Sequence, residues 1–165
     1  MPMRGRLAVL LAVATAGLIA APTSAVAACD GTSRPVFGTA SGTNAINLAT
    51  GTFTSDATGR VSHLGRTSFH IQGTFGITAP GVTVSGLMTL TSASGDRLTG
   101  AFQGSGTIGA GTIEITATFR PSGGTGRFAH ASGLLSGTVH ERILSMTGGI
   151  LSNATEFRFS GRLSY

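Results

Sequence analysis

Hydrophobic and polar residues alternate along most of the chain after residue 35. The period of two is clearest over 69–77 and 113–119, where every second residue is apolar or small. This period is typical of β-strands with one buried face. The opposite faces carry polar side chains such as His70 and Glu114, which favours antiparallel hairpins over a sheet buried on both sides. No segment after residue 28 has a helical period, so the pattern predicts an all-β protein.

Nine runs are interpreted as strands, because turn signals rich in glycine, proline and serine separate most of them. The runs are Val36–Gly42, Ala45–Phe53, Arg60–Leu64, Thr67–Thr78, Val82–Thr91, Arg97–Gly104, Thr112–Arg120, Leu134–Thr147 and Thr155–Tyr165. We interpret them as eight strands, with one run merged into another or lying at the periphery.

Glycines inside the predicted strands favour a closed barrel. Five of them fall on the apolar faces: Gly73, Gly86, Gly100, Gly137 and Gly161. A glycine within a strand costs about 0.5–1 kcal/mol, and the sharply coiled strands of a small barrel give a geometric reason for that cost. A Thr/Gly-rich solenoid is the alternative, but Gly-Thr pairs do not recur at a fixed period. We therefore predict an eight-stranded antiparallel closed barrel.

Residues 1–28 have the three parts of a secretory signal peptide. Arg4 and Arg6 precede an apolar run, Leu7–Ala21, and small residues follow up to Ala28. The run is short for a membrane-spanning helix. Cleavage after Ala27 or Ala28 would leave residues 29–165 as a single domain, long enough to bury a core.

Cys29 leaves two predictions of localisation open. It is the one cysteine in the sequence, so it has no partner for an internal disulfide. Val26-Ala27-Ala28-Cys29 resembles a bacterial lipobox, in which the cysteine would be acylated and would anchor a cell-surface lipoprotein. Pro22-Thr23-Ser24 separates the apolar run from this box more than is usual. Secretion as a soluble protein is therefore favoured over lipidation.

Charge and composition narrow the partners. Without Arg4 and Arg6, nine arginines and six acidic residues leave a net charge near +3. The arginines are scattered singly, which argues against nucleic acid as a partner. The four histidines lie on separate predicted strands and a loop, so no metal site is predicted. We expect no cofactor, and a small hydrophobic molecule is the expected partner; the sequence does not indicate an oligomeric state.

The segment 123–133, between two predicted strands, contains the most distinctive motif of the chain. Gly123, Gly124 and Gly126 allow backbone conformations that other residues resist, and Phe128 then returns the chain to the interior. Gly-Gly-Thr-Gly-x-Phe, followed by small residues and Gly133, resembles the motif of dirigent proteins and allene oxide cyclase-like barrels. The chain is most similar to the small secreted bacterial members of that superfamily, which are of unknown function. Ser62-His63-Leu64-Gly65-Arg66 and the segment 93–98 continue the resemblance.

The resemblance covers residues 59–165 and implies a calycin-type eight-stranded barrel. Its motifs belong to turns and packing, and the interior polar residues of the family's cyclases do not align with positions here, so no catalytic residue is carried over. We expect a non-catalytic secreted barrel that holds a small apolar ligand or contacts a surface partner. A cyclase or isomerase acting on a small hydrophobic substrate inside the barrel is the alternative.

Glu141 is the candidate catalytic and ligand-binding residue. Alternation places it on the interior face of its strand, where an unpaired carboxyl group would have a raised pKa. A bulge in the long run 134–147 would instead turn it outward beside Arg142, and of the two placements the outward one is favoured. Phe102 and Phe119 are the further candidates to line a ligand pocket.

His63 and Arg66 are assigned a structural role. Their turn-flanked setting predicts a tight hairpin in which Arg66 binds backbone carbonyls or a carboxylate. Gly123, Gly124, Gly126, Phe128 and Gly133 are assigned to the same structural motif.

Overall fold

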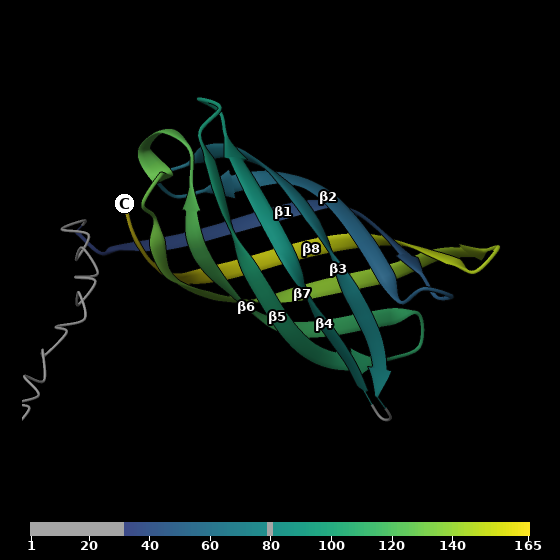
Figure 1. The fold of residues 1–165 in the computed structure, drawn as a ribbon. Helices are drawn as coiled ribbons and strands as arrows, with labels where there is room; N and C mark the ends of the chain where they lie inside the picture. The colour runs from purple at the N-terminus through teal and green to yellow at the C-terminus, as the bar shows by residue number, and fades with distance from the viewer. Residues whose placement is uncertain (1–31, 79–80) are drawn as a thin grey trace, which may run out of the picture.

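The chain forms a closed barrel of eight antiparallel strands, which confirms the predicted fold class (Figure 1). A computed structural model describes residues 32–78 and 81–165. The predicted signal peptide and Cys29 lie outside the described residues. The strands are β1 (Arg34–Asn47), β2 (Thr52–Val61), β3 (Gly65–Thr78), β4 (Gly81–Ser92), β5 (Arg97–Ile108), β6 (Thr112–Gly124), β7 (Ser132–Thr147) and β8 (Ile150–Ser164).

Each strand pairs with its neighbours in sequence, and β1 pairs with β8 to close the barrel. The division of residues 36–64 into three strands was wrong. The first two predicted runs overlap β1, the turn falls at residues 48–51, and β2 runs through to Val61. The sequence interpretation allowed one run to merge into another. Such a merger explains why the barrel has eight strands rather than nine.

The up-and-down order gives the barrel two different ends. The connections β1–β2, β3–β4, β5–β6 and β7–β8 lie at what we call the four-hairpin end. The other connections and the C-terminus lie at the loop end, together with the start of β1 (Figure 1). The loop end includes a 3₁₀ turn, η1 (Gly126–Phe128). No helix among the described residues is long and apolar enough to cross a membrane.

The interior glycines let neighbouring strands approach closely. Gly73 on β3 faces Gly86 on β4 across the ladder. A Cβ at Gly73 would lie 2.1 Å from the backbone oxygen of Ser85, and one at Gly86 would lie 2.1 Å from that of Gln72. Gly100, Gly137 and Gly161 have similar clashes with the next strand's backbone. The coiling that the sequence predicted therefore depends on bare backbone at these positions.

The core fills the barrel with aromatic and branched aliphatic side chains. Phe69 stacks on Phe157 with 6.2 Å between ring centroids, and Phe53 meets Phe102 edge-on at 6.0 Å. Phe128 is fully buried at the loop end, as predicted.

Candidate functional site

Glu141 points into the barrel and is 4% exposed, so the favoured outward placement was wrong. The irregularity in β7 does exist, but it lies between Ile143 and Ser145, beyond Glu141. Regular alternation therefore continues through Glu141 and keeps its carboxyl group inside. Burying a carboxyl group is costly unless hydrogen bonds compensate.

Two asparagine side chains provide that compensation. Asn44 Nδ2 donates to Glu141 Oε1 at 2.6 Å, and Asn153 Nδ2 donates to Oε2 at 2.7 Å. Asn44 and Asn153 face each other across the β1–β8 ladder, which is the seam that closes the barrel. Thr155 lies directly opposite Glu141 on β8. One carboxyl oxygen is thus held from the adjacent strand β8 and the other from β1, on the far side of β8.

The same cluster contains hydrogen-bonding atoms that no protein group satisfies. Asn44 Oδ1, Asn153 Oδ1 and Thr155 Oγ1 are buried without a partner among the described residues. Buried polar atoms in native proteins almost always have a hydrogen-bond partner, and each exception requires an explanation. The two amide oxygens accept hydrogen bonds only, whereas the hydroxyl group can donate or accept. The cluster is therefore suited to a group that donates hydrogen bonds.

Burial raises the pKa of Glu141 above its ordinary value of 4.5, and the hydrogen bonds from Asn44 and Asn153 partly offset this increase. Both effects have direct causes. Removing a carboxylate from water disfavours its charged form, and N–H donors favour that form. Among the described residues, Glu141 is the one ionisable side chain that is buried.

The cluster borders a cavity of about 80 Å³ inside the barrel. Asn44, Ser55 and Glu141 contribute polar groups to its wall, and Phe102 and Phe119, the candidates for ligand binding, also line it. Other phenylalanines cover much of the remaining wall: Phe53, Phe69, Phe75, Phe157 and Phe159. Several interior-facing side chains that border the cavity are only partly buried: Met88, Ala117, Val139, Phe157 and Phe159.

The cavity limits the size of what it can hold. Pockets for drug-sized ligands usually have volumes of roughly 300–1,000 Å³, and a dry cavity of about 150 Å³ accepts benzene. A volume of about 80 Å³ suits a smaller molecule with a few non-hydrogen atoms. Met88 lines the cavity and has a flexible side chain that can adjust to an occupant.

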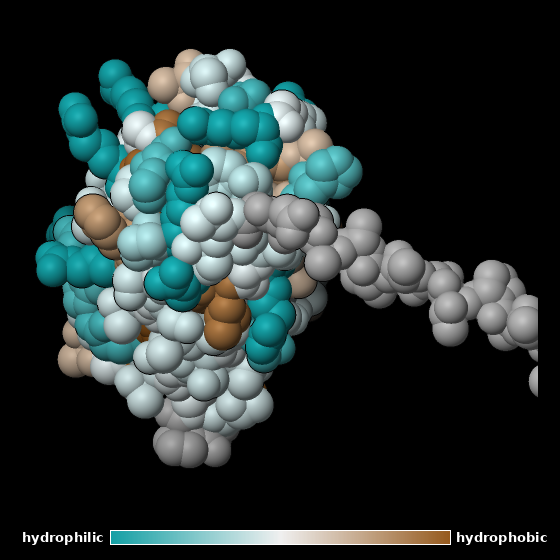
Figure 2. All heavy atoms as spheres, turned by 90° about the vertical axis from the view of Figure 1, so that its left-hand side faces the viewer, coloured by the Kyte–Doolittle hydropathy of each residue, from teal (hydrophilic) through white to brown (hydrophobic). Residues whose placement is uncertain are grey.

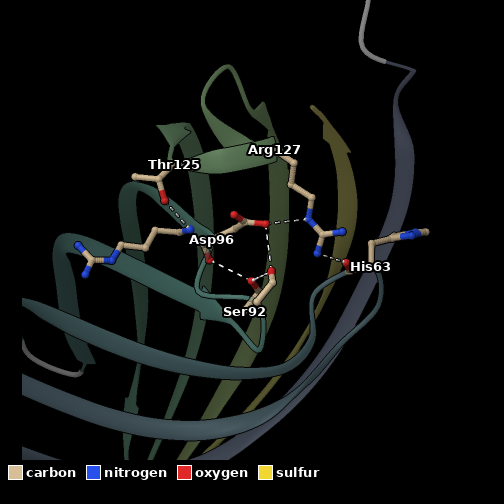
Figure 3. Close-up of polar contacts among 7 residues, drawn as sticks. His63, Ser92, Asp96, Thr125 and Arg127 are labelled. Carbon is tan, nitrogen blue, oxygen red and sulfur yellow. Dashed lines mark hydrogen bonds and ion pairs between the residues drawn. The ribbon is translucent and has the colours of Figure 1, made fainter.

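The glycine-rich motif forms an anchored loop at the loop end, away from the cavity (Figure 3). Gly123, Gly126 and Gly133 have positive φ angles of 131°, 57° and 153°, while Gly124 does not. A Cβ at Gly126 would lie 1.9 Å from Asp96 Oδ1, so this carboxylate fits against the turn only because the residue is glycine. Phe128 then packs on Tyr165 with 5.0 Å between ring centroids.

Arg127, rather than the predicted Arg66, binds the backbone of the 62–66 hairpin, and it thereby joins the glycine-rich loop to that hairpin. Its Nη2 donates to the backbone oxygen of His63 at 2.6 Å, and its Nε lies 3.6 Å from Asp96 Oδ2 (Figure 3). His63 has a positive φ of 66°, and its Nε2 lies 3.1 Å from the backbone oxygen of Pro35. His63 therefore takes part in the hairpin as predicted, whereas the side chain of Arg66 makes no hydrogen bond or ion pair with residues 32–78 and 81–165.

Arg66 lies instead on the outer wall, directly opposite Arg60. Arg60 faces Thr39, which in turn faces Arg158. The three arginines border one surface hollow. Arginines that look scattered in the sequence are thus brought together by the register.

Two of the exposed histidines, His70 and His140, pair with acidic groups. His70 Nδ1 lies 2.8 Å from Asp56 Oδ1, and His140 contacts Glu114. Both pairs are on the outer wall, where exposed ion pairs contribute little to stability. The described part of the chain contains no group of three or more His, Cys, Asp or Glu side chains that could hold a metal ion.

Asn44, Asn153 and Thr155 were not among the residues predicted for the site. The sequence pattern placed Asn44 between two predicted strands and Asn153 before the last predicted strand. Neither residue was therefore assigned to an interior or exterior face. Alternation extended over Ala40, Gly42, Asn44 and Ile46 would have placed Asn44 inside.

Comparison of the chain with models of protein families, with curated proteins and with solved structures found no match in any of the three.

Proposed function

We propose that this protein is a secreted, non-catalytic binding protein that holds a small, largely apolar molecule inside the barrel. The observation that carries the proposal is the unsatisfied side-chain oxygen of Asn44, which lines a phenylalanine-rich cavity together with Glu141. Apolar pockets with a few converging polar groups are the usual form of small-molecule sites. The ligand would carry one hydrogen-bond donor, such as a hydroxyl or N–H group, on a compact apolar body.

A binding role is favoured over catalysis by the composition of the cavity wall. General acid–base catalysis needs groups that exchange protons near the working pH. Glu141 can do so, but Asn44 and Asn153, which hold both of its oxygens, cannot. The site therefore offers one proton-exchanging group without a second one beside it.

Pyrrole and furan are suitable probes, because they are five-membered rings of nearly the same shape and only pyrrole has an N–H donor. A ligand that binds the folded protein raises its melting temperature, and at equal concentration the ligand that binds more tightly raises it more. We expect pyrrole to raise the melting temperature more than furan at equal concentration. In Asn44→Leu combined with Glu141→Leu, which removes the acceptor oxygens of both side chains from the cavity wall, the difference between the two probes should shrink. Equal shifts for the two probes in the unmodified protein would contradict the proposal.

A cyclase or isomerase is the second candidate, favoured by the raised pKa of Glu141. Isomerisation and internal cyclisation leave the mass of a substrate unchanged but alter its chromatographic retention. Incubating the protein with a small-molecule extract of its host, followed by mass spectrometry, would show such a change. The change should disappear in Glu141→Gln if Glu141 transfers the proton. If no compound is converted at constant mass, and pyrrole still raises the melting temperature more than furan, the result supports binding and contradicts catalysis.

A further inference from the structure

Exposed aliphatic side chains gather at the four-hairpin end of the barrel. Six of the nine large hydrophobic side chains that are exposed among the described residues lie on the connections there or on adjoining strand residues. We call these six the apolar tips: Leu48, Ile77, Ile108, Leu144, Met146 and Ile150. Met146 is 67% exposed and Ile77 is 66% exposed. The tips come from all four hairpins, so the feature belongs to the whole end of the barrel.

The segments that form the tips of this end have no ionisable side chain among their described residues, and the exposed Arg142 borders them, directly opposite Thr112. The segments concerned are 47–52, 76–78, 81–82, 107–112 and 143–153. The loop end is different, since it carries Arg34, Asp96, Arg97, Arg127 and Arg162. Figure 2 shows that end with hydrophilic side chains standing around it. The charges of the barrel are thus distributed unevenly along its axis.

The backbone of the four-hairpin end is partly satisfied by bonds between hairpins. The backbone N–H of Leu48 donates to the oxygen of Gly149 at 2.9 Å, and that of Ile143 donates to the oxygen of Gly111 at 2.9 Å. A third bond, 2.7 Å long, joins Phe75 to Gly51. These groups need no water, which matters because unsatisfied backbone groups are costly in an apolar medium.

The shape of this end favours lipids, rather than a second copy of the chain, as the partner. The apolar tips are distributed over four hairpins, three of them on β7–β8. This hairpin projects far beyond the barrel body (Figure 1). A second copy of the chain would need an apolar hollow to receive such a projection. Of three hollows on the described outer wall, two are lined largely by hydroxyl groups, glycines and arginines, and the third also contains Phe37 and Phe159, so none is lined by apolar side chains alone. Lipids rearrange around an apolar projection and need no preformed hollow.

We propose that the four-hairpin end docks on the surface of a lipid bilayer, with the apolar tips inserted among the lipid headgroups and the first part of the acyl chains. Exposed turns such as Gly148–Gly149 limit insertion to roughly 5–10 Å, the depth of interfacial elements. Binding does not need anionic lipids, because the apolar tips themselves carry no charge and Arg142, which borders them, is set back from the tips beside Thr112. The surface is independent of the interior site, and of any acyl group on Cys29.

Vesicle flotation tests this proposal. The probe is a vesicle of phosphatidylcholine alone, compared with one that also contains phosphatidylglycerol, each at low and high salt. The protein carries Cys29→Ser throughout, so that no acyl chain contributes. We expect flotation with both vesicles at both salt concentrations. Leu144→Ser combined with Met146→Ser should lower the partition coefficient about tenfold or more, and Ile77→Ser combined with Ile108→Ser should do the same from two other hairpins.

The matched control is Leu87→Ser, which removes a side chain that is 58% exposed on the outer wall of β4. It should leave partitioning within about twofold of the parent. Thermal melts establish that each variant is folded, and the second pair of tip variants serves if the first pair unfolds. Three outcomes would overturn the proposal: flotation only with phosphatidylglycerol and only at low salt, equal losses in tip and control variants, or no flotation combined with a dimer that the tip variants dissociate.

Discussion

Asn44 and Glu141 are 97 residues apart in the chain, and the side-chain amide of Asn44 donates to Glu141 Oε1 at 2.6 Å. The contact exists because β1 closes the barrel against β8, which places Asn44 beside Asn153 and both near β7. A buried carboxyl group is thereby held at the closing seam. The interior site is thus a direct consequence of barrel closure.

Glu141→Gln should remove part of the pH dependence of the free energy of unfolding. The folded protein binds the proton of Glu141 more tightly than the unfolded chain does, because burial raises its pKa above 4.5. Unfolding therefore releases a proton between 4.5 and the raised pKa, and stability falls as pH rises through this window. Glutamine lacks this loss, and either asparagine can rotate its amide to accept from Gln. The free energy of unfolding of the parent, measured relative to that of the variant, should fall as pH rises from 4 and become constant above the raised pKa.

Urea unfolding of the two proteins from pH 4 to 9 measures this difference. Other titrating groups are shared, so their contributions cancel. Superimposable pH profiles, or a parent that gains stability relative to the variant as pH rises, would contradict a raised pKa at Glu141.

Phe128→Ala should destabilise the protein by about 3–5 kcal/mol. Phe128 is fully buried against Tyr165, and the Arg127 guanidinium lies 4.8 Å from its ring centroid. Denaturant unfolding gives the free energy. Phe37→Ala is the control, because Phe37 is exposed and its loss should change stability by less than about 0.5 kcal/mol. A loss below about 1 kcal/mol for Phe128→Ala would show that the loop contributes little to the core.

The fold was more predictable than the site, and the reason lies in the range of the signals. Alternation over 69–77 and the glycines at Gly73 and Gly86 are local features, so they predicted strands and a barrel. The orientation of Glu141 depended on where β7 becomes irregular, which the sequence does not mark. Asn44 and Asn153 acquire their role only from the β1–β8 pairing, a contact between the first and last strands. Arg127 was overlooked because Arg66 lies in the resembling motif, whereas the carboxylate of Asp96 that Arg127 reaches comes from a different loop.

Gly73→Ala tests the close approach of β3 and β4. The added methyl group would lie 2.1 Å from the backbone oxygen of Ser85, and backbone cannot move aside as a side chain can. We expect a loss of about 1–3 kcal/mol, typical of overpacking. Gly76→Ala on the same strand is the control, because its methyl group would meet only the Thr83 hydroxyl at 2.9 Å. Thermal melts that rank Gly76→Ala as the more damaging change would refute this account of the coiled strands.

Arg127→Ala should loosen the glycine-rich loop and lower stability by about 1–2 kcal/mol, toward the low end of the range for a hydrogen bond of a charged group, because the Arg127 side chain is 44% exposed. The bond concerned is the one to the backbone oxygen of His63. Arg66→Ala removes an arginine without such a bond and should change stability by less than about 0.5 kcal/mol. Amide hydrogen exchange of residues 124–131 should quicken in the first variant and not in the second. The reverse ranking would restore Arg66 as the fastening residue.

The most direct test of the interior site is an NMR titration of the Glu141 carboxyl carbon, followed together with the side-chain amides of Asn44 and Asn153. The carboxyl resonance should titrate with a midpoint above 4.5, because burial raises its pKa. Both asparagine amides should shift with the same midpoint, since each donates to one carboxyl oxygen. A midpoint at or below 4.5, or asparagine amides that do not follow the carboxyl group, would contradict a buried carboxyl group held by two amides inside the barrel.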